Sequence, residues 1–235
     1  MYSTVIDRLT HQPLSFSVSE TTKGVHIHIV DAELMGKGEK EKKDLYIEGI
    51  QNNGIISHYE YIVNGEGMIE IRHILKPEGK MPLWFPRIGL TLTVSDALDQ
   101  VKWYGRGPQE NYPDRKTGYP TGIYSSTVQD MYEPYLMPQD YGLRTDVRWL
   151  QLTADKGIGL QIKMDEWFNF NIYPYSTDNL TKAMYTYQLQ KQNSITLNLD
   201  YATTGVGCTA RGVFGAYKAM PQEYRRTISI RPMMK

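Results

Sequence analysis

Two carboxylates four residues apart, Glu110 and Asp114, are the first groups in this sequence whose type and spacing could do chemistry. They belong to the stretch GRGPQENYPDRKTG (105–118), which also holds three glycines, two prolines and three basic side chains. A pair of carboxyl groups is the machinery of a sugar hydrolase, in which one acts as acid and the other as nucleophile or base. The same pair could instead brace a rigid loop.

The neighbouring charges favour bracing. Arg106, Arg115 and Lys116 lie on the same proline-flanked loop as Glu110 and Asp114. Nearby cations lower the pKa of a carboxyl group, whereas a general acid needs a raised pKa. We therefore expect the two arginines to bond these carboxylates or nearby carbonyl groups and to hold the shape of the loop.

Histidine and cysteine offer few other candidates. His26 and His28 alternate on one expected strand and could share a metal, but the sequence shows no third ligand nearby. His58 and His73 lie on neighbouring expected strands, where a structural role is favoured. Cys208 is the only cysteine, which excludes an intrachain disulfide. It is expected to be a small buried packing residue, because all five histidines that could activate it lie at or before residue 73.

The elements that must position these groups are β-strands. Only STDNLTKAM (176–184) predicts a short helix, with Ser176 as its N-cap. Residues 106–146 carry few alternating runs, and loops of that length are usually functional or docked on something. The whole pattern predicts one large antiparallel all-β domain over residues 1–235, built from two packed sheets. Alternating apolar and polar side chains predict its strands at 14–20, 25–34, 54–63, 68–75, 87–94, 101–105, 147–153, 157–164, 168–175, 194–201 and 224–232.

The amino-acid composition limits the classes of partner that the protein is expected to bind. The 26 basic and 26 acidic residues balance, which argues against nucleic acid or an anionic membrane as the main partner. No apolar run approaches the roughly 20 residues of a membrane span. The first residues, MYSTVIDRLTHQ, show neither part of a secretory signal. The 18 tyrosines suit strands, and also surfaces that contact sugars or proteins.

Three longer runs are more specific: WYGRGPQENYPDR (103–115), DMYEPYLMPQDYGLRTDVRWLQL (130–152) and LNLDYATTGVGC (197–208). In this order they resemble the C-terminal, small-chain domain of glycoside hydrolase family 2 β-galactosidases. The resemblance is close over residues 80–235 and looser over 5–80. It implies a galactose-mutarotase-like super-sandwich of two large antiparallel sheets. It also implies that the chain is a fragment that lacks the first strands of that fold.

The resemblance places catalysis outside this chain. In such enzymes the acid/base and nucleophile glutamates lie on a central (β/α)₈ barrel with its magnesium and sodium sites, so no catalytic residue, metal or cofactor is expected here. The chain would pack on the barrel through 106–146 and shape the active-site mouth with 205–217. The parent is expected to be a bacterial homo-oligomer that hydrolyses terminal β-D-galactosides. Cytoplasm and periplasm both stay open as its compartment.

Family members place a tryptophan against the substrate shortly after a run resembling GVGC (205–208). The corresponding position here lies near Gly212, and no tryptophan is present there. Arg211, Phe214 and Tyr217 are the candidates to replace it, although Phe214 could instead fill the core.

Two other functions stay open. An aldose 1-epimerase on the same fold would need a histidine and a glutamate that converge on a concave sheet face. A carbohydrate-binding module would use exposed aromatic rings.

Overall fold

The computed structural model describes residues 20–21, 24–25, 54–65, 67–155, 157–208 and 212–234. His26, His28, Arg211 and most of the strands expected at 14–20 and 25–34 lie outside these residues. At the N-terminal end, the described pairs β1 (Glu20–Thr21) and β2 (Gly24–Val25) form a short antiparallel ladder.

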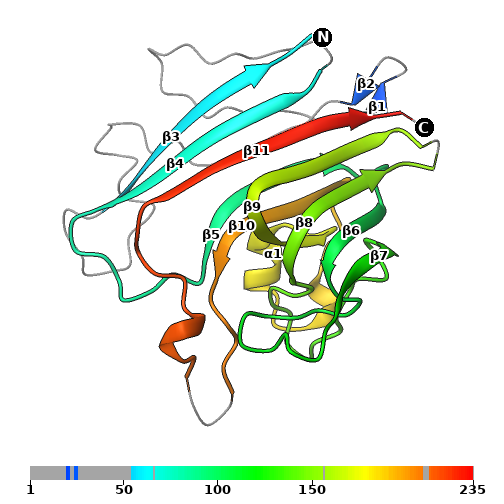
Figure 1. Ribbon diagram of the computed structural model, residues 1–235. Helices are drawn as coiled ribbons and strands as arrows, with labels where there is room; N and C mark the ends of the chain where they lie inside the picture. Colours follow the sequence, from blue (N-terminus) through cyan, green and yellow to red (C-terminus); the bar gives the residue numbers. More distant parts are fainter. Residues whose placement is uncertain are drawn as a thin grey trace.

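The remaining described strands form a nine-stranded antiparallel sheet, which confirms the all-β prediction (Figure 1). Its strands are β3 (Gly54–Val63), β4 (Ile69–Glu78), β5 (Arg87–Ser95), β6 (Gln100–Arg106), β7 (Thr121–Thr127), β8 (Arg144–Thr153), β9 (Gly159–Tyr173), β10 (Ser194–Thr203) and β11 (Tyr224–Met233). The described helices are short: α1 (Thr177–Lys182) and the 3₁₀ turns η2 (Thr186–Gln188) and η3 (Gly215–Tyr217).

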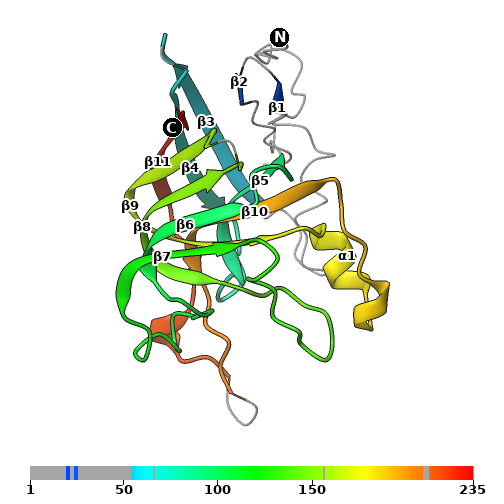
Figure 2. The same ribbon diagram turned by 90° about the vertical axis from the view of Figure 1, so that its right-hand side faces the viewer.

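The sheet forks at β9. The first part of β9, Gly159–Met164, pairs with β11, whereas its last part, Asn169–Tyr173, pairs with β10. One arm therefore runs through β11 to β4 and β3, and the other runs through β10 to β5. Figure 2 shows the two arms running in different directions. The expected separate strands at 157–164 and 168–175 are thus the two halves of one strand.

A bulge of several residues on β9 lies at the fork. On β8 a single residue, Arg148, lies between the register pairs of Val147 and Trp149, whereas β9 holds Met164–Trp167 between the partners of those pairs. Extra residues on one strand bend it and break its alternation of faces. The bulge therefore explains why the sequence pattern of β9 reads as two strands.

Side chains of the bulge bind the start of β11. The carboxylate of Asp165 accepts a hydrogen bond from the backbone N–H of Thr227 at 3.0 Å. The carboxylate of Glu166 lies 2.8 Å from the guanidinium of Arg226. These contacts hold β11 to β9 next to the point where their ladder ends.

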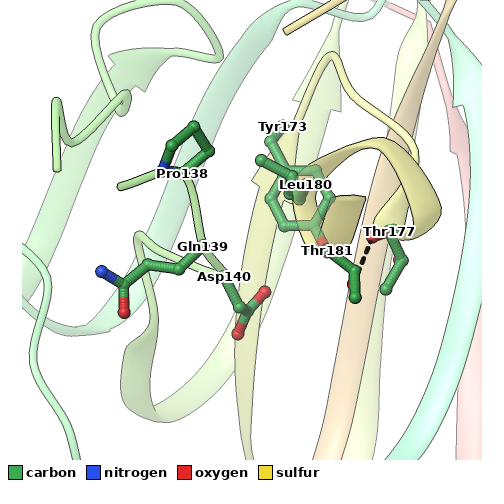
Figure 3. Close-up of a pocket in the computed structure, with 7 residues that line it drawn as sticks. All are labelled: Pro138, Gln139, Asp140, Tyr173, Thr177, Leu180 and Thr181. Atoms are coloured by element: carbon green, nitrogen blue, oxygen red, sulfur yellow. Dashed lines mark hydrogen bonds between the residues drawn. The ribbon is translucent and has the colours of Figure 1, made fainter. Parts of the chain in front are cut away.

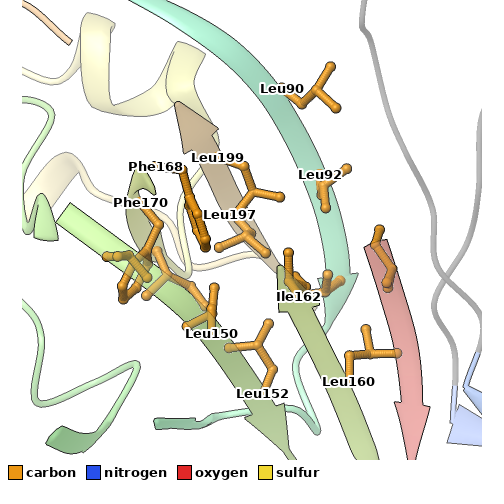
Figure 4. Packing of buried hydrophobic residues seen from close by; sticks show 14 of the residues in the cluster. Leu90, Leu92, Leu150, Leu152, Leu160, Ile162, Phe168, Phe170, Leu197 and Leu199 are labelled. Atoms are coloured by element: carbon orange, nitrogen blue, oxygen red, sulfur yellow. The ribbon is translucent and has the colours of Figure 1, made fainter. Parts of the chain in front are cut away.

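The two arms share one apolar core (Figure 4). On β5 every second residue is buried, as its alternating sequence predicts. Each large side chain removed from water contributes about 1.5–3 kcal/mol. The core includes Leu90 and Leu92 of β5, Leu150 and Leu152 of β8, Leu160, Ile162, Phe168 and Phe170 of β9, and Leu197 and Leu199 of β10.

A smaller cluster lies under α1. Leu180 of this helix is buried with Tyr141, Tyr173 and Tyr175. The hydroxyl of Ser176 accepts a hydrogen bond from the backbone N–H of Asn179 at 3.0 Å, which confirms the predicted N-cap.

Strand β7 corrects the expectation that residues 106–146, with few alternating runs, form one long loop. It pairs with β6 along Thr121–Thr127, and none of its residues is buried. An edge strand without a buried face has no need for alternating apolar residues, so the sequence pattern did not reveal it.

His73 is buried between three hydroxyl-bearing side chains. Its Nδ1 lies 2.7 Å from the hydroxyl of Tyr201, its Nε2 lies 2.7 Å from the hydroxyl of Ser57, and its ring stacks on Tyr59 at 4.0 Å. Burial lowers the pKa of His73 to about 3, and the exposed His58 adds to the shift. These contacts join β4 to β3 and β10.

We predict that His73 makes the fold less stable in mild acid. Its folded pKa is depressed, so its full contribution is present above the unfolded value of about 6.5 and is lost as the pH falls toward about 3. Between pH 6.5 and 5 the loss is about 2 kcal/mol, because one pKa unit corresponds to about 1.4 kcal/mol.

Urea unfolding at pH 7.5 and 5.0 measures this effect. His73→Gln should lose less stability than the wild type between the two pH values. The control His58→Gln should keep most of the wild-type dependence, because burial is the larger cause of the His73 pKa shift and His58 the smaller one. An equal loss in all three proteins would contradict the assignment.

Candidate functional site

Glu110 is at the centre of a hydrogen-bonded brace within the 106–146 loop. Its Oε1 accepts bonds from the guanidinium of Arg115 at 3.0 Å and from the hydroxyl of Tyr135. Its Oε2 accepts bonds from the hydroxyl of Tyr112 at 3.1 Å and from the backbone N–H of Gly142 at 2.9 Å. The buried carboxylate is therefore occupied by the protein on both oxygens, and it joins the start of the loop to its end.

A second brace centres on Asp146, which sequence reasoning missed. Arg106 donates from Nε to one carboxylate oxygen at 2.5 Å, and Lys116 donates to the other at 2.7 Å. Arg106 also donates to the carbonyls of Lys116 and Tyr119 at 3.1 and 2.9 Å. Burial alone would raise the pKa of Asp146, but the bonds from the two cations outweigh burial and lower it.

Asp146 has this position because β8 carries an extra residue there. Its φ of 54° lies in the left-handed region, which aspartate tolerates better than most residues. The register of β8 on β9 shifts between Arg144 and Val147. An aspartate in a strand next to basic loop residues is the one sequence feature that could have pointed to it.

Asp114 connects the loop to the 205–217 segment. Its carboxylate accepts bonds from the backbone N–H groups of Val206 and Gly207 at 3.1 and 2.7 Å. Gly205 allows this approach, because a Cβ at that position would lie 2.3 Å from the carboxyl carbon of Asp114. Glu110 and Asp114 thus bind different parts of the chain.

Most of the described residues shortly after Gly207 are exposed, namely Cys208, Gly212 and residues 214–217. Phe214 is 66% exposed, so the alternative that it fills the core is wrong. Cys208 is also exposed, which corrects the expectation of a buried packing residue. Cys208 follows Gly207, whose backbone N–H is bonded to Asp114. This part of the chain projects beyond the sheet and is drawn in orange at the bottom of Figure 1.

Backbone bonds connect this segment to the stretch before β5. The N–H of Gly205 donates to the carbonyl of Tyr217 at 2.8 Å, and Phe85 and Ala219 form an isolated bridge. Large exposed apolar side chains come from both segments. We call them the end surface: Leu83, Trp84, Val206, Phe214, Tyr217 and Met220.

A cavity of about 240 Å³ lies between the 138–140 turn and α1 (Figure 3). It is smaller than the roughly 300–1,000 Å³ of pockets for drug-sized ligands. Asp140 at its edge accepts hydrogen bonds from Asn171 at 2.8 Å and Arg87 at 3.3 Å. The cavity is lined by Pro138, Gln139, Asp140, Tyr173, Thr177, Leu180 and Thr181. These residues include neither the braced carboxylates nor the exposed rings of the end surface.

The described ranges hold no group of three His, Cys, Asp or Glu side chains placed to bind a metal. No helix among them is long and apolar enough to cross a membrane.

Comparison with known families places the chain in one of them. The model of the β-galactosidase small-chain family matches residues 10–230. This chain belongs to that family.

Relatives of this small chain are much longer proteins. It is 38% identical over 162 residues to a β-galactosidase of Priestia megaterium, covering 68% of the chain and 16% of that protein. It is 36% identical over 152 residues to one of Vibrio cholerae, covering 64% and 14%. It is 28% identical over 190 residues to β-galactosidase BgaC of Bifidobacterium adolescentis, covering 78% and 18%. The small chain therefore spans less than a fifth of the length of these relatives.

Among solved structures, the small chain is similar to a putative aldose 1-epimerase of Escherichia coli, with a TM-score of 0.38 and 6% identity over 94% of this chain and 69% of that one. It is also similar to an aldose epimerase homologue of C. elegans, with a TM-score of 0.39 and 12% identity over 93% and 68%.

We predict that the two members of the Glu110–Arg115 pair contribute unequally to stability. Glu110→Ala should cost about 3–5 kcal/mol, because it leaves several donors without their acceptor, and each buried donor left unsatisfied costs about 1–3 kcal/mol. Arg115→Ala should cost about 0–1 kcal/mol, because Arg115 is half-exposed and three donors to Glu110 remain. Urea unfolding measures both, and equal costs would argue against a brace centred on Glu110.

A methyl group at Gly205 should detach Asp114 from the 206–207 backbone. In Gly205→Ala we expect faster hydrogen exchange at the amides of Val206 and Gly207, because the new Cβ and the carboxylate compete for one space. The matched control is Gly212→Ala, where an added Cβ meets no atom within 4 Å. Exchange rates at 206–207 that stay at the wild-type value in Gly205→Ala would refute this link.

Proposed function

We propose that this chain is a non-catalytic domain of a β-galactosidase that supports an active site carried elsewhere in the enzyme. The observation that carries the proposal is the family match over residues 10–230 of a chain that covers only 14–18% of three β-galactosidases. The substrate of the parent enzyme would be a terminal β-D-galactoside, hydrolysed with retention of configuration.

The braced carboxylates support a non-catalytic role. A catalytic carboxyl group must exchange a proton or form a bond with the substrate. Both oxygens of Glu110 already accept two hydrogen bonds, and both oxygens of Asp114 hold backbone N–H groups. Their role in this proposal is to hold the 106–146 loop in the shape that packs on the catalytic domain.

The end surface is the part of the chain proposed to shape the active-site mouth. Phe214 and Tyr217 expose their rings on a segment that Asp114 binds through the backbone of Val206 and Gly207. An exposed ring held on a fixed backbone suits stacking against a sugar. Arg211 belongs to the same segment and is the third candidate for this contact.

The purified chain is expected to show no turnover of a chromogenic β-galactoside and no mutarotase activity. Adding the separately expressed remainder of its β-galactosidase should restore hydrolysis. Hydrolysis by the chain alone that disappears in Glu110→Gln would show that the brace is catalytic and would overturn the proposal.

In the reconstituted enzyme, Phe214→Ala or Tyr217→Ala should lower kcat/KM about tenfold, the value of one lost aromatic contact of about 1.4 kcal/mol. Tyr187→Ala is the control, because Tyr187 is an exposed tyrosine on η2 outside the end surface. Unchanged kinetics in both test variants would exclude these rings from substrate binding.

A further inference from the structure

A second group of aromatic side chains, exposed or half-buried, lies on the outer face of the sheet. In register, Tyr104 of β6 opposes Ile123 of β7 on one side and Trp149 of β8 on the other. Residues directly opposite in antiparallel strands project from the same face. The adjacent residue Trp103 is buried, so this row points away from the core. Ile123 is 61% exposed.

The bulge of β9 adds a tryptophan to this row. Trp167 is 60% exposed, and the guanidinium carbon of Arg148 lies 4.0 Å from its ring centroid and 5.0 Å from that of Tyr104. Arg148 is therefore held between two rings. We call Tyr104, Ile123, Arg148, Trp149 and Trp167 the outer aromatic face.

The same face is basic. Lys102 lies two residues before Tyr104 on β6, so it projects from the same face. Lys163 opposes Trp149 in register and projects from that face too. Both lysines are exposed. Of the nearby carboxylates, Glu166 pairs with the guanidinium of Arg226, and Asp165 accepts a bond from the neutral backbone N–H of Thr227. The three cations of this face outnumber these two acids. The chain has equal numbers of acidic and basic residues, yet basic side chains are concentrated around this group of rings.

These features discriminate between occupants. Arg148 covers one face of the Trp167 ring, which leaves less of it for stacking on a sugar. A second copy of the chain would bring like charges together, which costs energy. Tryptophan, tyrosine and arginine are the residues enriched at the centres of protein interfaces. A protein surface with acidic side chains fits both the rings and the charge.

We infer that the outer aromatic face docks on an acidic surface of the remaining part of the β-galactosidase. This inference rests on the proposed function. The relatives supply the occupant, because this chain corresponds to 14–18% of their length and the rest of such a protein must meet it. The face is also continuous with the first part of the 106–146 segment, because residues 107–120 connect the end of β6 at Arg106 to the start of β7 at Thr121.

The test measures the affinity of the purified chain for the separately expressed remainder of its β-galactosidase by biolayer interferometry. Trp167→Ala and Arg148→Glu should each weaken binding at least tenfold. The double variant Lys102→Glu/Lys163→Glu should weaken it and reduce its salt dependence. Tyr187→Ala, which removes an exposed ring elsewhere, should bind like the wild type. Circular dichroism checks that each variant is folded.

The outcomes separate this inference from the proposed function. Wild-type binding that the Trp167 and Arg148 variants retain would overturn the docking face and leave the proposed function standing. A wild-type chain that neither binds nor restores hydrolysis would overturn both. Two results would assign the face to another occupant. One is self-association of the chain that Trp167→Ala abolishes, and the other is binding to a glycan array that the same variant abolishes. Binding that is insensitive to salt would overturn the acidic partner.

Discussion

The exchange of partners along β9 is the constraint on which the rest of the structure depends. One edge of a strand can pair with only one neighbour at a time, so β9 must leave β11 before it meets β10. The bulge at Met164–Trp167 makes this change, and Asp165 and Glu166 fasten the end of the first ladder. The two arms can then close their apolar faces around one core, while Trp167 is turned outward.

Strand β8, next to the fork, links the bend of β9 to the shape of the loop after β6. β8 matches the bent β9 with its own irregularity, and Asp146 occupies the left-handed position there. That carboxylate accepts hydrogen bonds from Arg106, the last residue of β6, and from Lys116 on the loop that follows. The shape of the loop is therefore coupled to the sheet geometry, not only to contacts within the loop.

Local patterns in the sequence predicted most strands and part of the site. Where one face is buried, as in β5, alternation predicted the strand within one residue of its ends. It did not predict β7, which buries no side chain, or the continuity of β9 across its bulge. The pairing of Arg115 with Glu110 spans only five residues, so the charge pattern of the sequence predicts it. The bonds from Tyr135 and Gly142 to Glu110 depend on how the loop closes, which no local pattern shows.

The contact between Asp114 and the 206–207 backbone shows why a carboxylate was needed there. Two successive N–H groups at an exposed turn would otherwise bond to water, and a charged acceptor binds them more strongly than a neutral one. A carboxylate whose two oxygens are both engaged by backbone N–H groups has neither oxygen free for a substrate. The two acidic residues that first suggested a hydrolase thus have the chemistry of anchors. They hold the exposed rings of the 205–217 segment and the loop after β6 on the sheet, and the proposed role at an active site carried elsewhere would require that rigidity.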